Sequence, residues 1–111
     1  MASRVFITQQ QPGFDYSSAE DFGRVVSIWP SNVQAWGDTR HLAADARRIL
    51  SDFDPDQDYL LPMGDPALMC MASAEVSIGT DGTFNVLKWD RRKGKTGGYR
   101  VVEIDLDGQP V

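Results

Sequence analysis

Five stretches of the chain have the composition and length of β-strands. They are rich in β-branched and aromatic residues, with Gly, Pro or Asp close to their ends. The predicted strands are Arg4–Gln9, Arg24–Trp29, Asp58–Met63, Thr83–Trp89 and Tyr99–Leu106. In the last strand, Val102, Ile104 and Leu106 fall at alternate positions, which predicts one apolar face. The last two strands are expected to form a hairpin, with residues 93–98 as its loop.

Two segments between these strands have helical patterns. Ser17 followed by Glu20 has the form of a capping box, which predicts a short helix through Phe22. Farther along, apolar residues at i, i+4, i+7 and i+8 predict an amphipathic helix from Asp38 to Leu50. These apolar residues are Leu42, Ala46, Ile49 and Leu50.

The most informative segment joins the third strand to a third helix. Gly64 allows a tight turn, Asp65 can cap a helix, and Pro66 is typical of a first helical position. The helix is therefore predicted from Pro66 to about Ser77. Because it is apolar on nearly every side, we expect it to be among the most buried elements, with Cys70 as a small core residue.

The predicted elements run ββαβαββ, with a small extra helix early in the chain. This order is typical of the α/β class, at its border with α+β. We expect one domain over residues 1–111, with a mixed five-stranded sheet, two main helices and a C-terminal β-hairpin. Strand-helix-strand crossovers make strands two to four parallel, and the hairpin makes the last pair antiparallel. The first and last strands are expected to leave open edges, and residues 107–111 to form a frayed tail.

The composition is that of a globular protein. Of 111 residues, 41% are apolar, which supports a core, and the single cysteine excludes an internal disulfide. The apolar stretch Ala67–Ala74 is far shorter than a membrane-spanning helix. Since the first residues also lack the pattern of a signal peptide, we expect a cytoplasmic protein without a membrane partner.

Charge is distributed unevenly along the chain. Six of the eleven basic residues lie in the thirteen positions from Lys88 to Arg100, where Asp90 is the only acid. They are Lys88, Arg91, Arg92, Lys93, Lys95 and Arg100. This segment carries +5, so the rest of a chain of net charge −5 carries −10. The sequence therefore predicts a basic projection on an acidic body.

The basic hairpin has three interpretations. Its cations could hold phosphates while Trp89 or Tyr99 stacks on a base, as in nucleic-acid-binding proteins. They could equally engage an acidic groove on another protein. The third interpretation is a solvated tip, with Trp89 turned into the core. For the hairpin alone we favour the solvated tip, because charged hairpin tips are ordinary and the acidic body would repel nucleic acid beyond the tip.

Two tryptophans, Trp29 and Trp36, bracket a six-residue loop. If both are exposed, they form an anchor for another protein, since Trp is frequent at the centres of interfaces. The alternative is that they fold back over the sheet edge as a lid on the core.

Gly64 and Asp65 are a second candidate site, for a small ligand or for hydrolysis, because α/β folds bind ligands at the carboxyl ends of parallel strands. We favour the architectural interpretation, because capping of the helix alone accounts for both residues and a carboxylate there would repel an anion. No catalytic residue, metal site or cofactor is predicted. The alternating Asp52, Asp54, Asp56 and Asp58 imitate a calcium loop, but Gln57 and Met63 stand where that loop needs Gly and Glu.

Several segments together resemble a known family. They are Arg4–Ile7, Ser18–Gly23, Asp58–Leu61 with Gly64–Pro66, Leu87–Arg91 and Val102–Leu106. They resemble small uncharacterised proteins encoded by tailed bacteriophages. The resemblance implies a phage gene expressed in a bacterial cytoplasm and carries no established activity.

The favoured hypothesis is a non-enzymatic phage accessory protein that binds a host or phage protein through its exposed aromatics or its basic hairpin. Self-association through a sheet edge is compatible with it. The alternatives are a nucleic-acid-binding factor that uses the hairpin, and a small-ligand binder or hydrolase at Gly64-Asp65.

Overall fold

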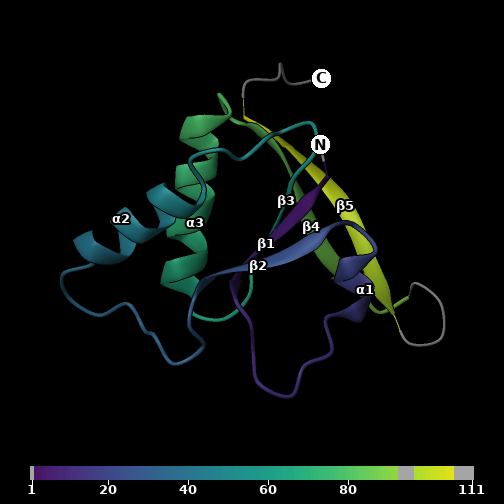
Figure 1. Cartoon of the computed structure of the whole chain (residues 1–111), viewed down its shortest axis with the longest axis horizontal. Helices are drawn as coiled ribbons and strands as arrows, with labels where there is room; N and C mark the ends of the chain where they lie inside the picture. The colour runs from purple at the N-terminus through teal and green to yellow at the C-terminus, as the bar shows by residue number, and fades with distance from the viewer. Residues whose placement is uncertain (1, 93–96, 107–111) are drawn as a thin grey trace.

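A computed structural model of the protein describes residues 2–92 and 97–106 (Figure 1). Its elements are β1 (Arg4–Gln9), α1 (Ser17–Glu20), β2 (Arg24–Trp29), α2 (Arg40–Ile49), β3 (Tyr59–Leu61), α3 (Pro66–Gly79), β4 (Thr83–Asp90) and β5 (Gly98–Asp105). The predicted α/β class, element order and C-terminal hairpin are confirmed. The predicted tail, residues 107–111, and residues 93–96 of the hairpin loop lie outside the described residues.

The five strands form one mixed sheet in the order β2-β1-β3-β4-β5. The first four strands are parallel, and β5 pairs antiparallel with β4. The expectation that β1 is an edge strand is wrong. The chain passes from β1 to β2 on one side and then crosses back over β1 to reach β3, so β1 has two neighbours and the edges are β2 and β5.

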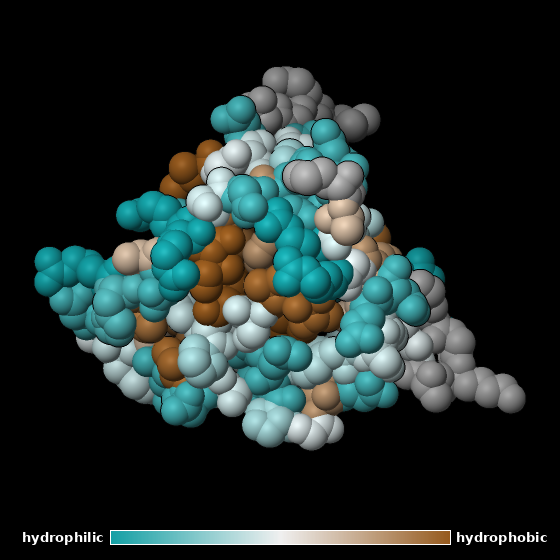
Figure 2. Space-filling view, viewed as in Figure 1, coloured by the Kyte–Doolittle hydropathy of each residue, from teal (hydrophilic) through white to brown (hydrophobic). Residues whose placement is uncertain are grey.

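Helices α2 and α3 cover one face of the sheet, which we call the helix side (Figure 1). Phe6, Leu60 and Phe84 from the sheet pack there against buried residues of both helices, and hydrophobic side chains gather between helices and strands in Figure 2. These helix residues are Leu42 and Ala46 of α2 and Leu68, Ala72 and Val76 of α3.

Helix α3, expected from its apolar composition to be among the most buried elements, is buried along one stripe only. Only Leu68, Ala72 and Val76 are fully buried, because the sheet and α2 together contact less than the whole circumference of the helix. Cys70, predicted as a core residue, is exposed.

The opposite face of the sheet has a smaller cover, made by α1 and the loop before it. Val5, Ile7 and Leu87 pack there against Ala19 of α1 and against Tyr16. The predicted capping box at Ser17 and Glu20 is not formed. Tyr16 is the N-cap residue and gives no side-chain cap, while the Ser17 backbone N–H donates to Oδ1 of Asp15 at 2.9 Å. This bond from residue i+2 to the side chain of residue i is an Asx turn, which satisfies the Ser17 N–H in place of the capping box.

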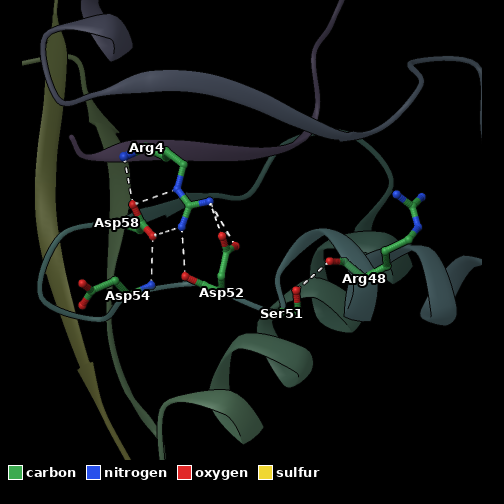
Figure 3. A network of polar contacts seen from close by, with 6 residues as sticks. All are labelled: Arg4, Arg48, Ser51, Asp52, Asp54 and Asp58. Atoms are coloured by element: carbon green, nitrogen blue, oxygen red, sulfur yellow. Dashed lines mark hydrogen bonds and ion pairs between the residues drawn. The ribbon is translucent and has the colours of Figure 1, made fainter. Parts of the chain in front are cut away.

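The amino ends of β1 and β3 are joined by a network around Arg4 (Figure 3). The Arg4 guanidinium binds the carboxylates of Asp58 and Asp52, and the backbone N–H of Asp54 also donates to Asp58. The segment 52–58, whose alternating Asp residues imitate a calcium loop in sequence, is therefore bound to the sheet through buried Asp58.

Candidate functional site

The β4–β5 hairpin separates its basic residues from its aromatic residues. Lys88 pairs with Arg100 across the two strands, and Trp89 pairs with Tyr99. Because successive side chains of a strand point to opposite faces, Lys88 and Arg100 lie on the helix side and Trp89 and Tyr99 on the other. Trp89 stacks edge-to-face on Tyr99, with 5.0 Å between ring centroids, and also contacts Phe14.

Asp90 organises the basic end of the hairpin. Its carboxylate accepts hydrogen bonds from the backbone N–H and the Nε–H of Arg92, at 2.9 and 3.3 Å, and forms an ion pair with Nε of Arg100. The Arg92 backbone N–H is the main cause of a lowered pKa of Asp90, and the guanidiniums of Arg92 and Arg100 lower it further. The ionised carboxylate therefore holds two guanidiniums in place while their remaining N–H groups face outward.

The side chains of Lys88 and Arg91 make no hydrogen bond or ion pair within residues 2–92 and 97–106. They line a hollow of about 440 Å³ together with Trp89, Asp90, Arg92, Arg100 and Val102. Of the six basic residues predicted as a binding patch, the structure thus brings four together around one hollow. The other two, Lys93 and Lys95, lie outside the described residues.

An apolar hollow of about 380 Å³ adjoins the basic one. Its helix-side residues are Pro62, Val86, Lys88, Val102 and Ile104, and the rest of its lining is Leu61, Met63, Leu87, Trp89 and Tyr99. The two hollows therefore share Lys88, Trp89 and Val102. Val102 is 38% exposed. We call this combined surface the hairpin face: Pro62, Val86, Lys88, Val102 and Ile104, with Arg91, Arg92 and Arg100 at its basic end.

The two candidate tryptophans have different roles. Trp29 is 2% exposed, and its indole Nε1–H donates to the Leu42 carbonyl oxygen at 3.2 Å. The interpretation of Trp29 as an exposed anchor is therefore wrong, because its ring completes the core beneath α2. Trp36 is 81% exposed, and its Nε1–H donates to Oε1 of Gln34 at 3.0 Å.

Asp65 caps α3, as the sequence predicts. Oδ1 accepts from the Ala67 backbone N–H, and Oδ2 accepts from the Ala35 backbone N–H, both at 2.8 Å. The Ala35 N–H is the main cause of a lowered pKa of Asp65, followed by the N–H groups of Ala67 and Leu68. Gly64 has a φ of +97°, and a Cβ at this position would collide with the Gln9 side chain. The joint thus has an architectural role.

Gln9 is the residue that sequence reasoning missed. Its Nε2 donates to the carbonyl oxygens of Pro30 and Val33 at 2.9 and 2.7 Å, and its Oε1 accepts from the Asp65 N–H at 2.8 Å. The loops that follow β2 and β3 are therefore both fastened to the end of β1. In the sequence, Gln9 is only a polar residue at the end of an apolar strand, which is a weak signal of a structural role. The signal becomes informative once β1 is known to be an interior strand, where a buried polar side chain needs hydrogen-bond partners.

A hollow of about 400 Å³ lies at the carboxyl ends of β1 and β3. From β1 the chain connects to β2 on one side and later to β3 on the other, so the strand order reverses between β1 and β3. Open α/β sheets usually bind ligands at such a point. The lining of the hollow includes Gln9, Gln11, Ser31, Gln34, Trp36 and Asp65. The structure thus brings Trp36 and the Gly64-Asp65 joint, two separate candidates in the sequence, into one site.

In the described part of the chain, no group of three or more His, Cys, Asp and Glu side chains could hold a metal ion. The same residues include no helix long and apolar enough to cross a membrane.

A protein-family model described as Phage Pam3 gp32-like protein matches residues 3–106. The chain belongs to this family. The match includes all five strands and three helices, and hence both the hairpin face and the hollow beside Trp36. It confirms the resemblance to small phage-encoded proteins. Among curated proteins, none matches the chain.

Proposed function

We propose that this phage protein acts by binding another protein, of the host or of the phage, in the bacterial cytoplasm, and that the hairpin face is its contact surface. The observation that carries the proposal is that an apolar hollow and a basic hollow adjoin at the β4–β5 hairpin and share lining residues. No enzymatic step is part of the proposal.

The apolar part of the hairpin face provides favourable free energy of binding through burial of its side chains. Val86 and Val102 are paired across the strands, and Ile104 continues the same side. Val102 keeps more than a third of its surface exposed to water, where contact with a partner would bury it. Burial of apolar surface stabilises a complex at roughly 25 cal/mol per Å² before the costs of association, so a side chain at this position can act as an anchor.

The basic end of the hairpin face selects for an acidic partner. The side chains of Lys88 and Arg91 form no hydrogen bond or ion pair with the described residues, and Asp90 binds Arg92 and Arg100 beside them. A carboxylate brought to this end would meet several cations in a small volume. The partner that fits is therefore an acidic segment with apolar side chains, attracted by the charge and held by the apolar hollow.

A second copy of the chain fits this surface less well. The open edge of β5 could pair antiparallel with its own copy, which keeps each residue opposite one on the same side of the sheet. Arg100 lies on the helix side, whereas Glu103 and Asp105 lie on the other side. No register of that pairing places Arg100 opposite either acid, so a partner with its own acidic residues is favoured.

Nucleic acid is the alternative partner, and the geometry favours it less. Its recognition would combine phosphate contacts with stacking of a base on an aromatic ring. Here Tyr99 is buried, and Trp89, which lines the basic hollow, is already packed against Tyr99 and Phe14. No fully exposed aromatic ring therefore stands beside the cations among the described residues of the hairpin.

The test compares two adjacent valines on opposite faces of β5. Val102→Glu places a charge in the hairpin face, and Val101→Glu places the same charge on the other face, where Val101 is 46% exposed. We expect capture of a specific protein from nuclease-treated host or phage-infected lysate by the wild type and by Val101→Glu, and its loss with Val102→Glu. Direct binding of the identified protein is then measured with purified components.

Charge is tested in the same assay. Lys88→Glu with Arg91→Glu should also lose the captured protein, while Arg24→Glu, an exposed cation on the far edge strand β2, should retain it. Capture that disappears after nuclease treatment, or a salt-sensitive mobility shift with DNA or RNA, would assign the surface to nucleic acid. A wild-type dimer that Val102→Glu dissociates would assign it to self-association. Equal effects of both valine substitutions would remove the hairpin face from the contact.

A further inference from the structure

We infer that the hollow at the carboxyl ends of β1 and β3 is a binding site for an uncharged sugar ring, separate from the protein contact proposed above. The hollow has about 400 Å³, at the small end of the range for ligand sites, which suits one or two rings. Its position is the one at which open α/β sheets usually bind ligands.

Charge excludes anionic ligands from this hollow. Asp65 is its one ionised lining residue, and hydrogen bonds from Ala35, Ala67 and Leu68 lower the pKa of its carboxyl group, so it stays ionised near neutral pH. No Lys or Arg lines the hollow. A phosphate or carboxylate would therefore meet a negative charge without a compensating cation.

The start of α3 also has no donors to offer a phosphate. Pro66 has no N–H, the Ala67 N–H is bound by Oδ1 of Asp65, and the Met69 N–H by the Asp65 carbonyl oxygen. Helix amino ends bind phosphate through free N–H groups, and here these groups are occupied. The nucleotide ligands common at this position in other α/β folds are thus disfavoured.

Trp36 provides an apolar platform at the mouth of the hollow. Its ring is 81% exposed, and the hydrogen bond from Nε1–H to Gln34 restrains it. The C–H face of a sugar ring can cover the indole by apolar contact, while hydroxyl groups at the ring edge stay free for hydrogen bonds. An unsupported exposed indole would lose more side-chain entropy on binding.

The remaining polar groups are neutral and match hydroxyl groups. Nε2 of Gln34, Oε1 of Gln11 and the Ser31 hydroxyl make no hydrogen bond within residues 2–92 and 97–106. They supply donors and acceptors around one volume, and a sugar hydroxyl can serve as either. Gln9 binds the loop that carries Ser31 and Gln34 and holds that loop in place without ligand.

The experiment follows the three tryptophan indole N–H signals in two-dimensional ¹⁵N NMR spectra. The probes are maltose and the N,N′-diacetyl disaccharide of glucosamine as neutral sugars, with glucose 6-phosphate and glucose as a charged and uncharged pair. We expect the neutral sugars to shift the Trp36 signal in a saturable way. The signals of buried Trp29 and of Trp89 on the hairpin serve as internal references and should not move.

Three variants make the outcome decisive. Trp36→Ala should weaken binding roughly tenfold or more, measured on the backbone signals of Gln34 and Gly64. Phe14→Ala, which removes another exposed aromatic ring outside the hollow, should leave the affinity unchanged. Asp65→Asn should allow glucose 6-phosphate to bind like glucose.

The inference is overturned if no neutral sugar shifts the Trp36 signal, if Trp36→Ala binds as the wild type does, or if the phosphate sugar binds the wild type equally well. Shifts by lysine or tetramethylammonium in place of the sugars would assign the hollow to cations attracted by Asp65 and Trp36. Because the hairpin face plays no part in these measurements, their failure leaves the proposed protein contact standing.

Discussion

Nη2 of Arg4 lies 2.8 Å from Oδ2 of Asp58, a carboxylate that is 1% exposed. The same guanidinium also binds Asp52, whose side chain is 71% exposed. Arg4 stands at the start of the central strand β1, and the two acids stand at either end of the segment that leads to β3. One cation therefore has a buried and a solvated partner, and only the buried one is expected to matter for stability.

Asp58→Ala should destabilise the protein by about 3 kcal/mol, because it leaves the Arg4 guanidinium and the Asp54 N–H without their buried acceptor. Asp52→Ala is the matched control on the same guanidinium, with an expected loss within about 1 kcal/mol. Urea denaturation of both variants measures the difference. Equal losses would show that burial of Asp58 is not what makes the pair stabilising.

The helices and strands could be predicted from the sequence because their signals are local. The predicted bounds of β1 and β2 match the structure, and Asp65 and Pro66 start α3 as expected. The neighbours of each strand could not be predicted, since they depend on the side on which each crossover passes. The central position of β1 follows from the opposite directions of the crossovers through α1 and α2.

Burial was predicted less well because it depends on which elements pack together. Trp29 and Trp36 bracket the same six-residue loop, yet α2 packs over the first and leaves the second exposed. The candidate site at Trp36 forms only because Gln9 brings the loop after β2 against the start of α3. That contact joins residues more than fifty positions apart, beyond any local pattern.

Gln9→Ala should destabilise the protein by roughly 2–4 kcal/mol, because it leaves the Asp65 N–H and the carbonyl oxygens of Pro30 and Val33 without their partner. Gln10→Ala, an exposed neighbour, is expected to change stability by less than about 0.5 kcal/mol. Hydrogen exchange should show faster exchange of the Asp65 N–H in the Gln9 variant. A variant as stable as the wild type would mean that water replaces the amide in all three bonds.

Cys70 should react with a thiol reagent such as a maleimide in the native protein, because its side chain is exposed on α3. Mass spectrometry after a short exposure without denaturant is expected to show one adduct per chain, with far-UV circular dichroism unchanged. Reaction only after denaturation would restore the interpretation of Cys70 as a core residue.

Asp65 should make the stability of the protein depend on pH in the acid range. Hydrogen bonds from the Ala35, Ala67 and Leu68 N–H groups lower the pKa of this carboxyl group in the folded state. A group with a lowered folded pKa stabilises the protein fully above its unfolded pKa of about 3.9, and the contribution is lost as the pH falls through the folded value. The wild type should therefore exceed Asp65→Ala in stability by a constant amount at neutral pH, and by less in acid.

Urea denaturation of the wild type and Asp65→Ala between about pH 7 and pH 2.5 measures this difference. Asp56→Ala is the control, because the Asp56 carboxylate is exposed and accepts no hydrogen bond within the described residues, so its substitution should have little effect at any pH. A difference for Asp65→Ala that keeps its full size in acid would mean that the protonated side chain caps α3 as well as the carboxylate does. The loop carrying Trp36 is fastened by the Ala35 bond, so the Trp36 fluorescence should follow the same acid transition.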